Sequence, residues 1–255
     1  MLKAFLCPFI STNMKTANPQ LLGVLGGMGP MATVDFLAKL IKATPASCDQ
    51  DHIPIIAHFV PQIPDRSDAI EGIGLSPQIA LENAALNIER EGAQALVIPC
   101  NTAHFWYEQI ASRLSIPVLH IADAVVEQIP LTLRKRPIGL LATKATLQSA
   151  IYQTRHPSIN WVIPTSDIVE NYLVPAIRYV KAGNLLTATA LLNQAIDQLQ
   201  FRGTATFVLG CTELPLAYNG NEDSLHVFDA TEALALSAVH WALSGNSKVT
   251  NAMTI

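Results

Sequence analysis

Two cysteines occupy matching positions in two similar passages of the chain. Cys100 follows the apolar run Ala95–Pro99, and Cys211 follows the apolar run Thr206–Gly210. A hydroxyl-bearing turn comes after each cysteine, and a further apolar run with its turn precedes each passage by a similar distance, at Leu21–Gly27 and Pro137–Thr143. One thiol at the same position of two similar halves predicts an acid and a base on opposite faces of one substrate carbon.

The residues around each thiol suit that chemistry. Each cysteine stands where a strand should give way to a helix, and a helix N-terminus favours the thiolate. Asn101, Thr102 and Thr212 add amide and hydroxyl donors suited to the α-carboxylate of an amino acid. The alternative is that each cysteine is a small buried apolar side chain. Two thiols at matching positions favour the catalytic interpretation.

Cations and glycines extend the candidate site. The run Gly23–Pro30 lacks the spacing of a dinucleotide fingerprint, so we expect a turn whose backbone approaches a small anion. Arg66 follows the second expected strand and could clasp a carboxylate, unless it is a surface arginine paired with Asp65 or Asp68. Lys181 ends an expected helix, where a cation is favourable on dipole grounds alone.

Histidines and acids are less informative. His104 lies one turn after Cys100 and could activate the thiol, orient a substrate or be structural. His52, His58 and His120 are interpreted as structural. The acids near strand ends are expected at most to orient Thr or Cys partners; they are Asp49, Asp51, Asp123 and Glu213.

The elements that must position these residues alternate between strand and helix, which indicates an α/β fold with two mostly parallel four-stranded sheets. Strands are expected at 21–26, 54–60, 95–99, 117–121, 137–142, 159–163, 205–210 and 225–228. Helices are expected at 30–43, 76–91, 103–114, 144–156, 167–181, 184–202 and 230–243. Ligands bind beyond the carboxyl ends of such strands, and both Cys100 and Cys211 fall at that edge.

Composition sets further bounds on the 255 residues. Half are apolar, 14% are charged and the net charge is −4, so no basic footprint for nucleic acid exists and no apolar run is long enough for a membrane span. The four cysteines match no zinc spacing, which indicates reduced thiols, no metal and a cytoplasmic protein. We expect an N-terminal extension over 1–18, in which Met14 is a second possible start. Two lobes are expected over 19–134 and 135–230. A C-terminal helix and tail are expected over 231–255, with the helix packed on the first lobe.

Taken together, these motifs resemble the aspartate racemase branch of the aspartate/glutamate racemase superfamily. The resemblance spans about 21–243 and rests on five segments in order: Gly26–Pro30, Pro61–Arg66, Pro99–His104, Val180–Asn184 and Gly210–Pro215. It implies two pseudo-symmetric lobes with the active site in the cleft between them, no cofactor and a homodimer.

The resemblance also implies roles for particular residues. Cys100 and Cys211 would be the catalytic acid and base, and Arg66 and Lys181 would recognise substrate. The other residues expected to bind substrate are Met28, Gln62, Asn101, Thr102, Thr143, Thr212 and Glu213. Glutamate racemases carry Gly-Cys-Thr-His where this chain has Glu213, which argues against glutamate as the main substrate.

The sequence therefore predicts cofactor-independent racemisation of aspartate, or of a similar acidic amino acid, by two cysteines. The alternatives are a broad-specificity amino-acid racemase that includes glutamate, a relative acting on dicarboxylates such as maleate, and a non-catalytic two-lobed amino-acid binding protein. A thiol hydrolase would need His104 paired with Cys100 and would leave Cys211 unexplained.

Overall fold

The structure is a computed structural model that describes residues 19–200, 203–220 and 225–244. The expected extension over 1–18, with Cys7 and Met14, and the expected tail after residue 244 lie outside the described residues. No helix in the described ranges is long and apolar enough to cross a membrane.

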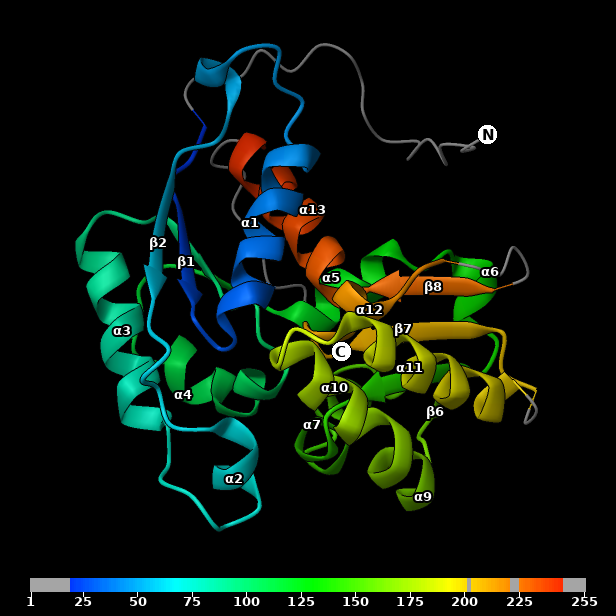
Figure 1. The fold of residues 1–255 in the computed structure, drawn as a ribbon. Coiled ribbons are helices and arrows are strands. Elements are labelled where there is room, and N and C mark those ends of the chain that lie inside the picture. Colours follow the sequence, from blue (N-terminus) through cyan, green and yellow to red (C-terminus); the bar gives the residue numbers. More distant parts are fainter. Residues whose placement is uncertain (1–18, 201–202, 221–224, 245–255) are drawn as a thin grey trace.

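Two four-stranded parallel sheets form the framework (Figure 1). Both sheets have the same order in space: from one edge to the other lie the second, first, third and fourth strands of that half of the chain. The first sheet contains β1 (Leu22–Gly26), β2 (Ile55–Phe59), β3 (Ala95–Val97) and β4 (Val118–Leu119). The second contains β5 (Ile138–Ala142), β6 (Trp161–Val162), β7 (Thr206–Gly210) and β8 (His226–Asp229). The predicted α/β fold with two similar halves is therefore confirmed.

The central strands are buried on both faces, as their continuous apolar sequences predict. Every residue of β1, β3, β5 and β7 is buried. Register pairs Val24 with Val97 in the first sheet and Leu141 with Leu209 in the second. Parallel pairing brings the carboxyl ends of β1 and β3, and of β5 and β7, to one edge of each sheet. The two thiols follow β3 and β7 at these edges.

Four long helices lie close to their expected positions: α1 (Pro30–Ala43), α3 (Gln78–Arg90), α11 (Leu185–Gln200) and α13 (Ala230–Leu243). Three expected helices are instead interrupted. The segment after Cys100 is a 3-10 turn, η2 (Thr102–Trp106), followed by α4 (Tyr107–Ala111). The segment after Thr143 divides into α7 (Lys144–Gln148) and α8 (Ile151–Arg155) at Ala150, which has a left-handed backbone with φ 52°.

The third interrupted helix passes through a π-helical turn. It runs from α9 (Ser166–Ile168) through η3 (Val169–Leu173) to α10 (Val174–Lys181). Pro175 lies in the first turn of α10, and a proline cannot donate a hydrogen bond to the preceding turn. The wider turn therefore comes where a regular helix would have met the proline ring.

The structure also contains short helices that the sequence did not predict. They are η1 (Asp49–Asp51), α2 (Arg66–Ile70), α5 (Ile121–Gln128), α6 (Leu131–Arg134) and α12 (Leu214–Ala217). Of these, α5 follows β4 with only His120 between them, and no glycine or proline marks the change. It nevertheless buries Ile121, Ala122 and Val125 in the core.

Helix α13 returns from the second sheet to the first half of the chain. It packs against α1 and α5, and Figure 1 shows its orange-red ribbon beside blue α1. The backbone N–H of Gln20 donates to the carbonyl of Ala242 over 2.9 Å, which joins the segment before β1 to the end of α13. The last helix thus completes the first lobe.

The hydrophobic core is shared between the lobes. The larger cluster of buried side chains includes Val24 of β1 and Phe36 of α1 together with Phe207 of β7 and Leu234 of α13. A smaller cluster fills the other face of the first sheet, under α3, and includes Leu81 and Leu96. The two halves are therefore similar in topology but are not separated by a break in the larger core.

Candidate active site

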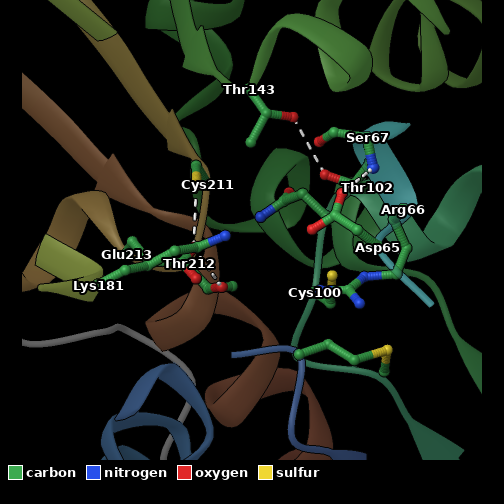
Figure 2. A pocket seen from close by; sticks show the side chains of 12 residues that line it. Asp65, Arg66, Ser67, Cys100, Thr102, Thr143, Lys181, Cys211, Thr212 and Glu213 are labelled. Carbon is green, nitrogen blue, oxygen red and sulfur yellow. Dashed lines mark hydrogen bonds between the residues drawn. The ribbon is translucent and has the colours of Figure 1, made fainter. Parts of the chain in front are cut away.

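A small cavity lies where the carboxyl ends of the two sheets meet (Figure 2). The empty space within it, including the part that is open to solvent, is about 330 Å³. Its lining comes from both halves of the chain and consists of Met28, Asp65, Arg66, Ser67, Cys100, Asn101, Thr102, Thr143, Lys181, Cys211, Thr212 and Glu213. Figure 2 shows Cys100 and Cys211 on opposite sides of the pocket.

The glycine-rich turn after β1 brings backbone to the edge of the cavity. Gly27 has φ 97°, and a Cβ atom there would lie 2.5 Å from the backbone nitrogen of Val60. Its N–H donates to the Thr33 hydroxyl over 2.9 Å, which fixes the turn against the first turns of α1. Only glycine fits this position, and the following residue, Met28, is buried against the cavity.

His104 holds the backbone of Cys100 rather than its thiol. Its Nδ1 donates to the Cys100 carbonyl over 2.9 Å, and its Nε2 accepts from the Ile121 N–H over 3.2 Å. Because a carbonyl only accepts, these contacts fix the tautomer of the imidazole. Burial lowers the pKa of His104 to about 4, so the ring is neutral near pH 7. Both ring nitrogens are engaged, which favours the structural alternative for this histidine.

Arg66 opens α2 with an unused donor. Its Nη1 donates to the carbonyls of Ile63 (3.1 Å) and Pro64 (3.0 Å), and its Nε is buried without a hydrogen-bond partner. Asp65 caps the helix, because its Oδ1 accepts from the N–H groups of Ser67 (2.7 Å) and Asp68 (3.1 Å). The arginine is therefore held by backbone and keeps a donor available to an anion in the cavity.

A cluster of hydroxyls crosses the seam between the lobes. The Thr102 hydroxyl lies 3.1 Å from that of Thr143 and 2.9 Å from that of Thr146. Thr143 also caps α7, since its oxygen accepts from the Thr146 N–H over 3.1 Å. Residues 102 and 143 come from different lobes, so the cavity wall here depends on both.

Asn101 is a second residue with an unused donor. Its Oδ1 accepts a 2.5 Å hydrogen bond from the hydroxyl of Tyr152, which is fully buried in the second lobe. Its Nδ2 is buried and has no partner. A buried unpaired donor is costly unless a ligand satisfies it. Asn101 and Arg66 both line the cavity, so a bound carboxylate could satisfy both donors.

The two thiols have opposite electrostatic neighbours. Burial raises the pKa of Cys100, and the adjacent Arg66 guanidinium opposes this increase. Burial also raises the pKa of Cys211, well above its usual value, and here the Glu213 carboxylate adds to the increase while Lys181 opposes it. The Cys211 Sγ–H donates to Glu213 Oε2 over 3.1 Å, and the Thr212 hydroxyl donates to the same oxygen over 3.3 Å.

These shifts correct one expectation. The sequence predicted that helix starts would lower both thiol pKa values, but in the structure both are raised. Cys100 is followed by a 3-10 turn and Cys211 by the four-residue α12, and such short segments carry little dipole. Burial outweighs them, because removing a thiolate from water is costly.

All but one of the predicted site residues line the cavity. The exception is Gln62, which is exposed, because the chain turns the next side chain, Ile63, into the core instead. Asp65 and Ser67 line the cavity but were not predicted. Asp65 was considered only as a surface partner of Arg66, although an Asp directly before a short helix is a capping signal that could have indicated it.

The described ranges contain no group of three or more His, Cys, Asp or Glu side chains arranged to hold a metal ion. The cavity is instead lined by two thiols, two cations, two carboxylates, and hydroxyl and amide donors. Fold and cavity together define a two-lobed α/β protein that can hold a small anionic molecule between two thiols.

The chain belongs to the Asp/Glu/Hydantoin racemase family, because its residues 25–238 match the sequence model of that family. It is 29% identical over 233 residues to the broad specificity amino-acid racemase RacX of Bacillus subtilis (strain 168), a match that covers 89% of this chain and 100% of that protein. Among solved structures it is similar to the Picrophilus torridus aspartate racemase, with a TM-score of 0.76, 33% identity and coverage of 88% and 94% of the two chains. An aspartate racemase homologue from Pyrococcus horikoshii OT3 gives a TM-score of 0.70 and 25% identity over 88% of this chain and 99% of that one.

Proposed function

We propose that this racemase interconverts L- and D-aspartate without a cofactor, using Cys100 and Cys211 as its two acid–base groups. The observation that carries the proposal is the presence of two buried thiols on opposite sides of one small cavity. One thiolate removes the Cα proton from one face, and the other thiol protonates the opposite face. The roles of the two cysteines exchange in the reverse reaction.

Two cations in the cavity support an acidic substrate. Arg66 and Lys181 come from different lobes and line the same space, so each can meet one carboxylate of a dicarboxylic amino acid. The unpaired Asn101 Nδ2 and Arg66 Nε would gain acceptors when a carboxylate binds. Burial strengthens these interactions where negative charge develops next to Cα. The similarity to an aspartate racemase agrees with this substrate.

A broad-specificity amino-acid racemase is the second candidate. It is favoured by the match to the Bacillus subtilis protein RacX, which extends over that protein's whole length. The two candidates differ in whether the second cation is needed. We further propose that the enzyme acts as a homodimer in the cytoplasm.

The first experiment follows deuterium incorporation. The protein is incubated in D₂O with L-aspartate, and Cα deuteration and the D-enantiomer are measured by NMR and chiral chromatography. Cys100→Ala and Cys211→Ala are each expected to reduce racemisation by at least about 10³-fold, because each removes one proton-transfer group. Cys48→Ala is the matched control, since Cys48 is exposed and does not line the cavity.

The outcomes separate the candidates. Racemisation at the parent rate in either cavity variant would overturn the two-base mechanism. Binding of aspartate without Cα deuteration would indicate an amino-acid binding protein instead. A panel of amino acids distinguishes the two racemase candidates, since a broad-specificity enzyme also racemises substrates with no second carboxylate.

A further inference from the structure

The carboxylate of Glu213 has a particular relation to Cys211. Glu213 Oε2 accepts the Cys211 Sγ–H at 3.1 Å, and both residues are more than nine-tenths buried. A carboxylate accepts but does not donate, so this contact exists only while the sulfur carries its proton. A thiolate at the same position would place two negative charges in contact in a buried site.

The surroundings of Glu213 show how its charge is accommodated. Its Oε1 lies beside Gly29, where an added Cβ atom would come within 3.1 Å of it. Gly29 is the N-cap of α1, a helix of 14 residues, so the carboxylate stands near an N-terminus that favours negative charge. The Thr212 hydroxyl provides a further hydrogen bond.

The other thiol has a different partner. Cys100 lies beside the Arg66 guanidinium of α2, which favours its thiolate, and the charge of Glu213 reaches it more weakly. Near Cys211 the other titratable groups are Lys181 of α10, which favours the thiolate, and Tyr152 of α8, whose buried phenol keeps its proton because its pKa is raised far above the ordinary value. The direct hydrogen bond to Glu213 distinguishes Cys211 from Cys100.

We propose that Glu213 is a positioning residue that keeps the proton on Cys211, so that Cys100 is the thiol that ionises first in the resting enzyme. This inference rests on the proposed function only in assuming that the two thiols exchange protons with substrate. In one turnover the Cys100 thiolate takes the Cα proton, and Cys211 gives its proton to the opposite face. The Sγ–H···Oε2 hydrogen bond is lost at that step. It returns when Cys211 regains a proton and Cys100 releases the one that it took, either by exchange with solvent or in the reverse reaction.

The test measures each thiol separately and needs no turnover. The full-length protein and Glu213→Gln are treated with limiting iodoacetamide from pH 6 to pH 10, and alkylation of Cys100 and Cys211 is quantified by peptide mass spectrometry. The pH midpoint of each cysteine is compared, because it reports ionisation independently of how accessible the sulfur is. Gln keeps the size of Glu and an oxygen that can accept from Sγ, but removes the charge.

The parent is expected to show a lower midpoint for Cys100 than for Cys211. Glu213→Gln is expected to lower the Cys211 midpoint by at least about one pH unit, a tenfold gain in reactivity below the midpoint, and to move Cys100 less. Glu213→Asp, which keeps the charge, is expected to stay closer to the parent. Glu91→Gln, a surface carboxylate paired with His58, is the control and should leave both midpoints unchanged.

Either of two results would overturn the inference. One is a parent in which Cys211 ionises at the same pH as Cys100 or below it, which can be seen even if Glu213→Gln fails to fold. Another is a Glu213→Gln midpoint for Cys211 that matches the parent. Alkylation is measured without substrate, so the two proposals can fail separately. Absence of racemisation would contradict the proposed function and leave this inference standing. Racemisation together with unchanged alkylation midpoints in Glu213→Gln would contradict this inference and leave the proposed function standing.

Discussion

Residues in the cavity are held by contacts that join the two lobes. The pair Asn101 and Tyr152 is an example, since one amide oxygen receives the phenol of the other lobe while the amide nitrogen keeps a free donor. Tyr152 therefore fixes which way the Asn101 side chain faces. Without it, the amide could rotate and lose the donor that we assign to substrate.

We therefore expect Tyr152→Phe to reduce the free energy of unfolding by about 1–3 kcal/mol, because it leaves the buried Asn101 oxygen without a donor. The measurement is urea denaturation followed by circular dichroism. Tyr107→Phe is the control, since its hydroxyl donates to the Val118 carbonyl in a less buried place and its loss should cost less. Equal effects of the two variants would contradict the role given to Tyr152.

His104 predicts a pH dependence of stability. Its folded pKa is lowered to about 4 by burial, against an ordinary value of about 6.5. Its stabilising effect is therefore complete above pH 6.5 and is lost as the pH falls toward 4, because the unfolded chain takes up a proton that the folded protein resists. The slope from this group approaches about 1.4 kcal/mol per pH unit.

The check is to compare the parent with His104→Gln in urea at pH 7.5 and pH 5. The variant is expected to be less stable at pH 7.5, since it changes two backbone contacts. It should then lose less stability than the parent on going to pH 5. A parallel loss in both proteins would show that His104 does not titrate as the structure indicates.

Elements were predictable where glycine, proline or a long apolar run marked them. The four buried strands β1, β3, β5 and β7 follow from such runs, and the carboxyl edge that carries Cys100 and Cys211 follows from parallel pairing. Helix interruptions were less predictable. The break at Ala150 depends on a left-handed residue that is neither glycine nor asparagine, which no local pattern announces.

Site residues, like the elements, were predictable where a local pattern places them and not where tertiary packing does. Residues next to strand ends, such as Asn101 and Thr212, reach the cavity because the fold brings those ends together. Gln62 lies in a turn whose direction is set by the burial of Ile63, so its side-chain direction could not be read from its neighbours alone. The raised thiol pKa values depend on tertiary burial, which a motif does not contain.

The turn after β1 gives a prediction at the scale of the element. Gly27→Ala is expected to destabilise the protein by well over about 2 kcal/mol, because it combines a left-handed backbone with a collision against Val60. Gly72→Ala is the matched control: its φ is 77° but nothing lies within 4 Å of the new Cβ, so only the backbone cost of about 1–2 kcal/mol applies. Thermal unfolding of both variants measures the difference, and similar melting temperatures would refute the steric role of Gly27.

At the scale of the whole molecule, ion pairs join the lobes on the outside of the shared core. Asp123 of α5 accepts from Arg155 Nε at Oδ1 (2.9 Å) and from Arg155 Nη2 at Oδ2 (2.7 Å), and His156 Nε2 also lies 2.9 Å from Oδ1. A second link runs from Lys39 of α1 to Asp229 at the start of α13, over 2.5 Å. Both links connect residues far apart in the sequence.

Asp123→Asn tests the first link. Partial burial alone would raise the pKa of Asp123, but the His156 and Arg155 contacts outweigh it and hold the pKa well below its ordinary value. Its contribution is therefore present above about pH 4 and is lost as the pH falls further. We expect the variant to lose about 1 kcal/mol at pH 7, a value reduced by partial exposure, and the difference in stability between parent and variant in urea to be smaller at pH 3 than at pH 7. A constant difference at both pH values would exclude the ion pair as its source.

The sequence predicted two similar lobes but not the degree to which they are joined. The repeated strands and turns follow from local patterns, whereas the contacts of α13 with α1 and α5 link residues from opposite ends of the chain. The larger core then continues from Val24 to Phe207 without a boundary. Such contacts depend on which apolar faces meet, and apolar periodicity does not specify a partner.

The continuous core has a consequence for how the chain gains and loses its structure. Halves that look separable by topology should unfold together, in one cooperative transition, because loss of either would expose apolar side chains of the other. A fragment ending before α13 would lack the helix that covers α1 and α5. Duplicated architecture here would therefore not mean autonomous folding units, and neither half alone is expected to fold in isolation.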